Sequence, residues 1–169
     1  MDTTLPQYEP VHDEFWALSV MATTMDNVRF RVWGIQPDVQ RQRPAGFNRS
    51  MIDTVSAMRR SEEAMLAAVK DALANDTPTI KTDFNAQSRT FVPSVEAELG
   101  HFLVARDDAL GLLRGLTAEQ WQRTINDPTQ GKRTIAQLTV ERAQSDLQYL
   151  DELNRLRHAL SRIESLQVR

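Results

Sequence analysis

The chain has 169 residues, of which 41% are hydrophobic, so it fits one domain that buries a single substantial core. Its formal charge of -3 and isoelectric point near 5.6 argue against nucleic acid or an anionic membrane as a partner, because either usually requires a concentrated basic patch. The absence of cysteine excludes disulfides, thiolate metal ligands and a cysteine nucleophile.

Two long helices are predicted in the first half of the chain. Apolar residues recur at helical spacing over about residues 11–34, where a glycine followed by Pro37 marks the end of the pattern. A second amphipathic pattern covers about residues 51–74. Ser50 precedes it and Asp53 lies three residues further on, so the serine oxygen is expected to cap the first turn.

Two more helices are predicted in the second half. Pro93 and Ser94 open a third apolar pattern, which ends near Gly115. Thr134 and Gln137 have the spacing of a capping box, and they open the fourth pattern. No stretch alternates apolar and polar residues convincingly over the length of a strand.

These patterns predict the fold class. Four amphipathic helices of about six turns each, with little strand signal, predict an all-α four-helix bundle with long inter-helix connections. One domain is expected over residues 1–169, with its core at about residues 12–162. The N-terminus lacks the basic and apolar regions of a signal peptide, and no apolar run approaches the roughly 18 residues of a membrane span, so a cytoplasmic protein is expected.

The longest predicted connection covers residues 75–92. Fully extended, a segment of this length spans about 55 Å, which is enough to run along a helix and start the third helix at the opposite end of the bundle. A crossover is therefore expected here. Phe84 and Phe91 are expected either to anchor this connection or to cover one mouth of the bundle.

The core-facing stripe of the fourth helix is polar at its centre. Steps of three and four residues place these side chains on one stripe: Leu138, Arg142, Ser145, Tyr149, Leu153, Leu156 and Leu160. Asp146 lies on its flank. The predicted core faces of the second and third helices also carry charges, Glu62 and Arg106, and Arg29 lies near the edge of the face of the first helix.

Buried charges are costly unless they are paired and hydrogen-bonded. The carboxylates of Glu62 and Asp146 are therefore expected to neutralise the guanidinium groups of Arg106 and Arg142. The serine and tyrosine of the stripe are expected to satisfy the remaining donors and acceptors. Such residues form either a closed network that fixes how the helices pack, or an open pocket in which an arginine binds the carboxylate or phosphate of a small anionic ligand.

Longer motifs surround this stripe. The run LLRGLTAEQWQRTINDPTQGKRTIAQLTVERAQSDLQYLDEL covers residues 112–153, and GIQPDVQRQRPAGFNRSMIDTVSAMRRSEEAM covers residues 34–65. Together they resemble the DinB/YfiT-like family of four-helix bundles. In that family a Leu-Thr-x-x-x-Trp turn and a Pro-x-x-Gly-x-x-Thr loop lead into a last helix that ends in His-Asp-x-x-His-Leu. The resemblance covers about residues 12–160, and it implies the family's bundle and a homodimer.

Many members of this family hold a divalent metal with one histidine on the second helix and two histidines, four residues apart, on the fourth. Carried over to this chain, the pair falls on Ser145 and Tyr149, on either side of Asp146. The third ligand falls on Met58, or on Ala57 if the register shifts by one residue. None of these is a good ligand for zinc, nickel or manganese. The resemblance therefore implies a bundle without the family's metal site and without a cofactor.

Three histidines remain in the chain: His12, His101 and His158. They lie far apart and at no ligand spacing, so each is expected at the surface or at its boundary. The candidate pocket in the bundle centre is instead formed by Met58, Glu62, Arg106, Arg142, Ser145, Asp146 and Tyr149. The sequence points to no catalytic residue, because the common nucleophile, phosphate-loop and zinc motifs are missing.

Three functions follow from the resemblance. The first is a metal-free DinB-like protein whose polar centre binds a small anionic ligand. The second is a thiol-dependent transferase or isomerase, and the missing histidines count against it because the metal is what deprotonates the thiol. The third is a non-catalytic interaction protein that dimerises through a helix face.

Overall fold

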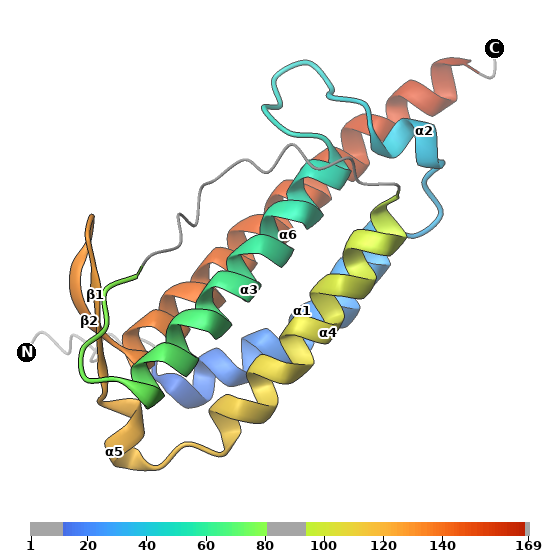
Figure 1. The fold of residues 1–169 in the computed structure, drawn as a ribbon. Helices are drawn as coiled ribbons and strands as arrows, with labels where there is room; N and C mark the ends of the chain where they lie inside the picture. The colour runs from blue at the N-terminus through green and yellow to red at the C-terminus, as the bar shows by residue number, and fades with distance from the viewer. Residues whose placement is uncertain (1–11, 81–93, 168–169) are drawn as a thin grey trace, which may run out of the picture.

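The computed structural model describes residues 12–80 and 94–167, and it consists of four long helices with small additions at both ends (Figure 1). The long helices are α1 (Glu14–Val32), α3 (Met51–Ala74), α4 (Val95–Arg114) and α6 (Ile135–Gln167). The additions are α2 (Pro37–Gln40), α5 (Ala118–Trp121), β1 (Thr124–Asp127) and β2 (Gly131–Thr134). This confirms the predicted four-helix bundle.

The helices do not follow a simple up-and-down order. α1 and α6 run in the same direction, and α3 and α4 both run in the opposite direction (Figure 1). α3 ends near the start of α6, whereas α4 starts at the other end of the bundle, so the connection between them joins opposite ends, as predicted. Phe84 and Phe91 lie outside the described residues.

Side-chain caps set where the long helices begin. At the start of α3, Ser50 and Asp53 each accept from the other's backbone N–H, which forms the predicted capping box. Ser94 accepts from the N–H of Ala97 and caps α4. Thr134 and Gln137 form the same reciprocal pair before α6. These three predicted starts are confirmed.

The β-hairpin is an addition to the bundle that the weak strand signal of the sequence did not predict. β1 and β2 pair antiparallel, with Ile125 opposite Arg133. Asp127 accepts from the backbone N–H groups of Thr129 and Gln130, which holds the turn. Each strand has four residues and only one apolar side chain is buried, so the pattern is too short to be recognised by alternation.

The apolar core is divided into two clusters. One lies at the end of the bundle that carries α5 and the hairpin, and its largest fully buried members are Met21, Met65, Leu113, Ile125 and Ile135. The other lies at the end that carries α2, and its largest fully buried members are Met51, Met58, Phe102, Leu153, Leu156 and Leu160. Charged residues lie between the two clusters, and these form the candidate site.

One contact fixes the end of α1 against α6. Arg157 donates from Nη1 to three backbone carbonyl oxygens, of Phe30 at 3.1 Å, Arg31 at 2.8 Å and Trp33 at 2.8 Å. The last carbonyls of a helix have no partner within the helix and carry partial negative charge, so a guanidinium group is well suited to this position. The parallel packing of α1 on α6 is therefore anchored at a defined register.

Candidate functional site

A layer of four buried charged side chains crosses the middle of the bundle. We call Glu62, Arg106, Arg142 and Asp146 the charged layer. The side chains of Glu62, Arg106 and Asp146 are fully buried, and that of Arg142 is 5% exposed. The predicted association of the two carboxylates with the two arginines is therefore confirmed.

Arg106 of α4 is the centre of the charged layer. Its guanidinium group donates to Glu62 Oε2 of α3 at 2.7 Å, to Asp146 Oδ2 of α6 at 2.6 Å and to the backbone oxygen of Met21 on α1 at 2.9 Å. One side chain thus binds all three other long helices. Its guanidinium carbon also lies 4.9 Å from the centre of the Phe102 ring, in cation–π distance.

Arg142 completes the charged layer from α6. It donates to Asp146 Oδ1, one turn along the same helix, and its Nε lies 3.8 Å from Glu62 Oε2. Asp146 therefore uses one oxygen for each arginine. With both carboxylates ionised, the two positive and two negative charges cancel, which is the condition under which buried charges are tolerated.

The two carboxylates differ in how burial affects them. Burial raises the pKa of Glu62, and the positive charges of Arg106 and Arg142 offset this effect only in part. Burial also acts to raise the pKa of Asp146, but the charges of Arg142 and Arg106 and their hydrogen bonds hold it below its ordinary value. For Arg106, burial acts to lower the pKa, but the charges of Glu62 and Asp146 raise it above its ordinary value. Glu62 is therefore the member of the layer that is most costly to ionise.

The charged layer is not completely hydrogen-bonded within the protein. Glu62 Oε1, Arg106 Nε and Arg142 Nε are buried and have no hydrogen-bond partner among the described residues. Both contacts of Glu62 use Oε2, so its second oxygen is an unused acceptor. Buried polar atoms of this kind are usually satisfied, so these three atoms are the exceptions within the charged layer.

The remaining predicted pocket residues contribute differently from the expectation. Ser145 donates to the backbone oxygen of Glu141 on its own helix and not to the charged layer. Tyr149 contacts the layer through its ring, whose centre lies 5.5 Å from the guanidinium carbon of Arg142 and 5.8 Å from that of Arg49. Met58 is fully buried in the apolar cluster at the α2 end. We expected the serine and tyrosine to satisfy the remaining donors and acceptors of the buried charges. This was wrong for Ser145, because its hydroxyl group donates to the preceding turn of its own helix instead.

Other charged and titratable residues lie away from the layer. Arg29 is exposed and pairs with Asp26 at 3.8 Å, so it does not belong to the core face. His12, His101 and His158 are all exposed, as predicted. His12 stacks on Trp16 near the start of α1, with the ring centres 4.1 Å apart.

The residues at the centre do not fit a metal ion. Within the described residues, no group of three or more histidine, cysteine, aspartate or glutamate side chains could hold one. The positions to which the family's histidines map carry a thioether, an aliphatic hydroxyl and a phenol, which are weak or poorly ionised donors. In addition, the nearby guanidinium groups of Arg106 and Arg142 would repel a cation.

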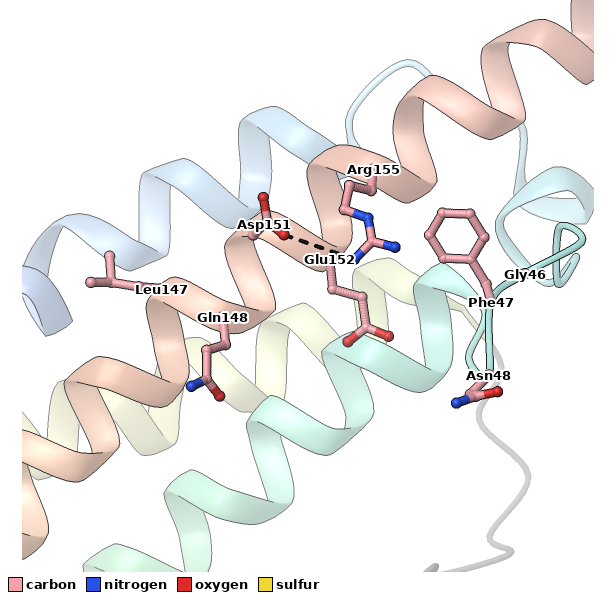
Figure 2. Close-up of a pocket in the computed structure, with 8 residues that line it drawn as sticks. All are labelled: Gly46, Phe47, Asn48, Leu147, Gln148, Asp151, Glu152 and Arg155. Atoms are coloured by element: carbon pink, nitrogen blue, oxygen red, sulfur yellow. Dashed lines mark ion pairs between the residues drawn. The ribbon is translucent and has the colours of Figure 1, made fainter.

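A surface groove that sequence reasoning missed lies over α6, beside the segment before α3 (Figure 2). Its volume is about 580 Å³, and it is lined by Gly46, Phe47, Asn48, Leu147, Gln148, Asp151, Glu152 and Arg155. Arg155 lies over the Phe47 ring at 5.4 Å and within 4.0 Å of Asp151, the pair marked by the dashed line in Figure 2. The groove depends on how residues 46–48 pack against α6, and no local sequence signal marks it.

The fold defines the class of protein: a four-helix bundle with a crossover between α3 and α4 and a charged layer at its centre. The chain belongs to the DinB superfamily, whose family model matches residues 21–145. Among solved structures it is similar to YfiT from Bacillus subtilis, described as a probable metal-dependent hydrolase with an unusual four-helix bundle topology.

The likeness to YfiT extends over most of both proteins. The TM-score is 0.70 at 19% sequence identity, and the matched region covers 91% of this chain and 93% of the YfiT chain. At this level of identity the likeness shows the shared fold. No curated protein matches the chain. Among the described residues, no helix is long and apolar enough to cross a membrane.

Proposed function

We propose that this DinB-superfamily chain works without a metal ion, as a binding bundle whose centre is held together by paired charges. The observation that carries the proposal is the bonding of Arg106 to Glu62, Asp146 and the backbone of Met21. Both carboxylates of the layer already serve as partners of arginines. Their negative charges are therefore already balanced by the two arginines, which leaves no net negative charge to attract a cation.

The charges at the centre also disfavour the two enzymatic alternatives. A metal-dependent hydrolase needs an open coordination site that lowers the pKa of a bound water. A thiol-dependent transferase or isomerase needs the ion to deprotonate the thiol. Both reactions would require a divalent cation beside Arg142 and Arg106, where the carboxylates of Glu62 and Asp146 are already paired with these arginines. We therefore infer a non-catalytic role.

Metal titration tests this proposal. Isothermal titration with zinc and nickel should give no stoichiometric binding to the wild-type protein. The variant Met58→His/Ser145→His/Tyr149→His should gain affinity, and binding should tighten as pH rises through about 6.5, where imidazole loses its proton. Gln144→His/Gln148→His is the matched control, because it places two imidazoles four residues apart on an exposed part of α6.

The outcomes separate the ligands from the shape of the site. Wild-type binding of one metal per chain would contradict the proposal. Binding by the triple variant that exceeds that of the control pair would show that the α3 position completes a site with the α6 pair. Equal binding by both variants would show that the geometry of the centre, and not only its ligands, differs from that of metal-binding family members.

A small anionic ligand at the edge of the charged layer is a second candidate function. It is favoured by the two guanidinium groups, of Arg49 and Arg142, that lie against the one ring of Tyr149. Arg49 is 44% exposed and only loosely paired, 3.7 Å from Glu152, and Arg142 has an unused buried Nε. Arginine binds carboxylates and phosphates through charge-assisted hydrogen bonds, so an anion of either kind suits this position.

Thermal unfolding with added phosphate and acetate tests the second candidate. Either anion should raise the unfolding midpoint above that in sodium chloride of equal ionic strength, because a ligand that binds only the folded state stabilises it. Arg49→Gln should abolish the increase. Arg43→Gln is the control, because Arg43 is also exposed and paired with one carboxylate, Asp53 at 2.9 Å. An equal midpoint in all three salts would exclude this candidate.

A further inference from the structure

The groove over α6 has the size of a site for a small ligand. Its volume of about 580 Å³ lies within the range of roughly 300–1,000 Å³ that is common for ligand pockets. One wall is the outer side of α6 from Leu147 to Arg155, and the other is the segment 46–48 (Figure 2). Residues eight apart on a helix are separated by about 12 Å along its axis, so the groove can hold a molecule of about this length.

The two ends of the groove are apolar. The exposed side chain of Leu147 lies at one end, and the ring of Phe47 lies at the other (Figure 2). Phe47 is partly buried and packs against the apolar cluster at the α2 end of the bundle, which holds its ring in place. Aliphatic and aromatic side chains of this kind give the apolar body of a ligand a surface on which to pack.

The middle of the groove is polar and carries a net negative charge. It is lined by the carboxylates of Asp151 and Glu152 and by the amide groups of Asn48 and Gln148. Together with Arg155, the lining has two negative charges and one positive charge. A lining with this balance attracts a cation more strongly than an anion.

The carboxylate of Glu152 is available to a ligand. The Glu152 side chain is 26% exposed, and Figure 2 shows it extending from α6 on the side of the segment 46–48. Its ion-pair partner among the described residues is Arg49, and the two charged groups are 3.7 Å apart, which is longer than a hydrogen bond. Glu152 is therefore a largely covered carboxylate that can still accept a hydrogen bond from a molecule in the groove.

Arg155 shows how the groove holds a positive group. Its guanidinium carbon lies 5.4 Å from the centre of the Phe47 ring, and its Nη1 lies 4.0 Å from Asp151 Oδ2. An aromatic ring beside a carboxylate is an arrangement that also binds organic ammonium groups. The Arg155 side chain is mostly exposed, and an exposed ion pair contributes little to stability, so a ligand can displace it at small cost.

We propose that the groove binds a small organic ammonium compound with an apolar body. The ammonium group takes the place of the Arg155 guanidinium group beside the Phe47 ring and donates to Glu152 and Asp151. The apolar body extends along α6 to Leu147. This inference does not depend on the proposed absence of a metal, because no residue of the charged layer lines the groove.

NMR titration with 4-phenylbutylammonium tests the proposed ligand class. This compound should bind with saturation and shift the backbone amide signals of residues 46–48 and 147–155. The alcohol 4-phenylbutanol and the anion 4-phenylbutyrate have the same apolar body without the positive charge. Each should bind at least about tenfold more weakly, because the charge-assisted hydrogen bond to the carboxylate is lost. No binding of the amine, or equal or tighter binding of the alcohol or the anion, would overturn the proposal.

Charge variants test the proposed carboxylates. The variant Asp151→Asn/Glu152→Gln should weaken binding of 4-phenylbutylammonium by at least about tenfold. The matched control is Asp107→Asn/Asp108→Asn, because it also removes two neighbouring carboxylates, but from an exposed part of α4. The control should bind like the wild-type protein. Equal affinities of the two variants would mean that only the net charge of the protein attracts the amine, and would overturn the proposal.

Arg155→Ala tests the position of the ammonium group. Removal of the competing guanidinium group should tighten binding of 4-phenylbutylammonium by roughly two- to fivefold, since one exposed ion pair no longer has to be displaced. Arg114→Ala is the control, because it removes the same charge from an exposed position at the end of α4 and should leave the affinity unchanged. An affinity that rises no more in Arg155→Ala than in Arg114→Ala would overturn the proposal.

Discussion

Arg106 donates from Nη1 to Asp146 Oδ2 at 2.6 Å, and both side chains are completely buried. The two residues lie on α4 and α6, which occupy opposite corners of the bundle, so the contact crosses its centre. The other terminal nitrogen of the same guanidinium group, Arg106 Nη2, donates to Glu62 Oε2 at 2.7 Å. The bundle is therefore connected through its middle by charge, with an apolar cluster on each side.

Removal of Arg106 should strongly destabilise the fold. Arg106→Met keeps much of the side-chain volume but leaves Glu62 and Asp146 with Arg142 as their one remaining cationic partner among the described residues. Removing one partner of a buried ion pair leaves an uncompensated charge and typically costs about 3–5 kcal/mol. We therefore expect the free energy of unfolding to fall by roughly 3 kcal/mol or more. Urea denaturation measures this change.

Arg43→Met is the control for this measurement. Arg43 pairs with Asp53 at the surface and is 63% exposed, so its loss should cost at most about 1 kcal/mol. Arg142→Ala should resemble Arg106→Met, with a loss of roughly 3 kcal/mol or more, because Arg142 is also buried and paired. A loss below about 0.5 kcal/mol for either buried arginine would mean that water solvates the layer.

The two carboxylates should show opposite pH dependence. The pKa of Glu62 is raised on folding, so the native state binds more protons and this residue's contribution to stability falls as pH rises above its ordinary value of 4.5. The pKa of Asp146 is lowered, so its contribution is complete above the ordinary value of 3.8 and is lost as pH falls through the folded value.

Denaturant titrations of Glu62→Gln and Asp146→Asn at several pH values measure this difference. The destabilisation caused by Glu62→Gln should be largest at low pH and should decrease as pH rises above about 4.5. That caused by Asp146→Asn should be largest near neutral pH and should decrease below about pH 4. The same pH trend in both variants would show that the two carboxylates have equivalent environments, contrary to this account.

Arg157 should stabilise the junction of α1 and α6. Arg157→Ala removes a cation that donates to three carbonyl oxygens at the end of α1, and we expect a loss of about 1–3 kcal/mol in the free energy of unfolding. Arg155→Ala, two residues away, is the matched control, because Arg155 is 62% exposed and lies 4.0 Å from Asp151. Equal losses in the two variants would mean that the carbonyl contacts contribute little.

The sequence predicts those features that depend on nearby residues or on the general cost of burying charge. The starts of α3 and α6 are encoded within four residues by Ser50 with Asp53 and by Thr134 with Gln137. The pairing of Arg106 with Glu62 follows from helical spacing, because two charges on predicted core faces must find each other. Both kinds of feature require no knowledge of the loops.

The features that sequence reasoning missed depend on packing between distant segments or on competition between partners. The hairpin is short. Its residue Asn126 also forms an isolated bridge with Thr79, which lies far away in the sequence. The hydroxyl group of Ser145 could donate to the charged layer or to the carbonyl oxygen of Glu141 on its own helix. In the structure it donates to Glu141. The groove over α6 arises from the packing of residues 46–48, which no periodicity describes.

The metal content of the purified protein tests the central claim most directly. The protein should be produced in medium supplemented with zinc, nickel and manganese, dialysed without chelator and analysed by elemental mass spectrometry. Because the charged layer pairs both carboxylates with arginines, we predict far less than one transition-metal ion per chain. Retention of one metal ion per chain after dialysis would contradict the account, provided that removing this ion with a chelator also lowers the thermal stability of the protein.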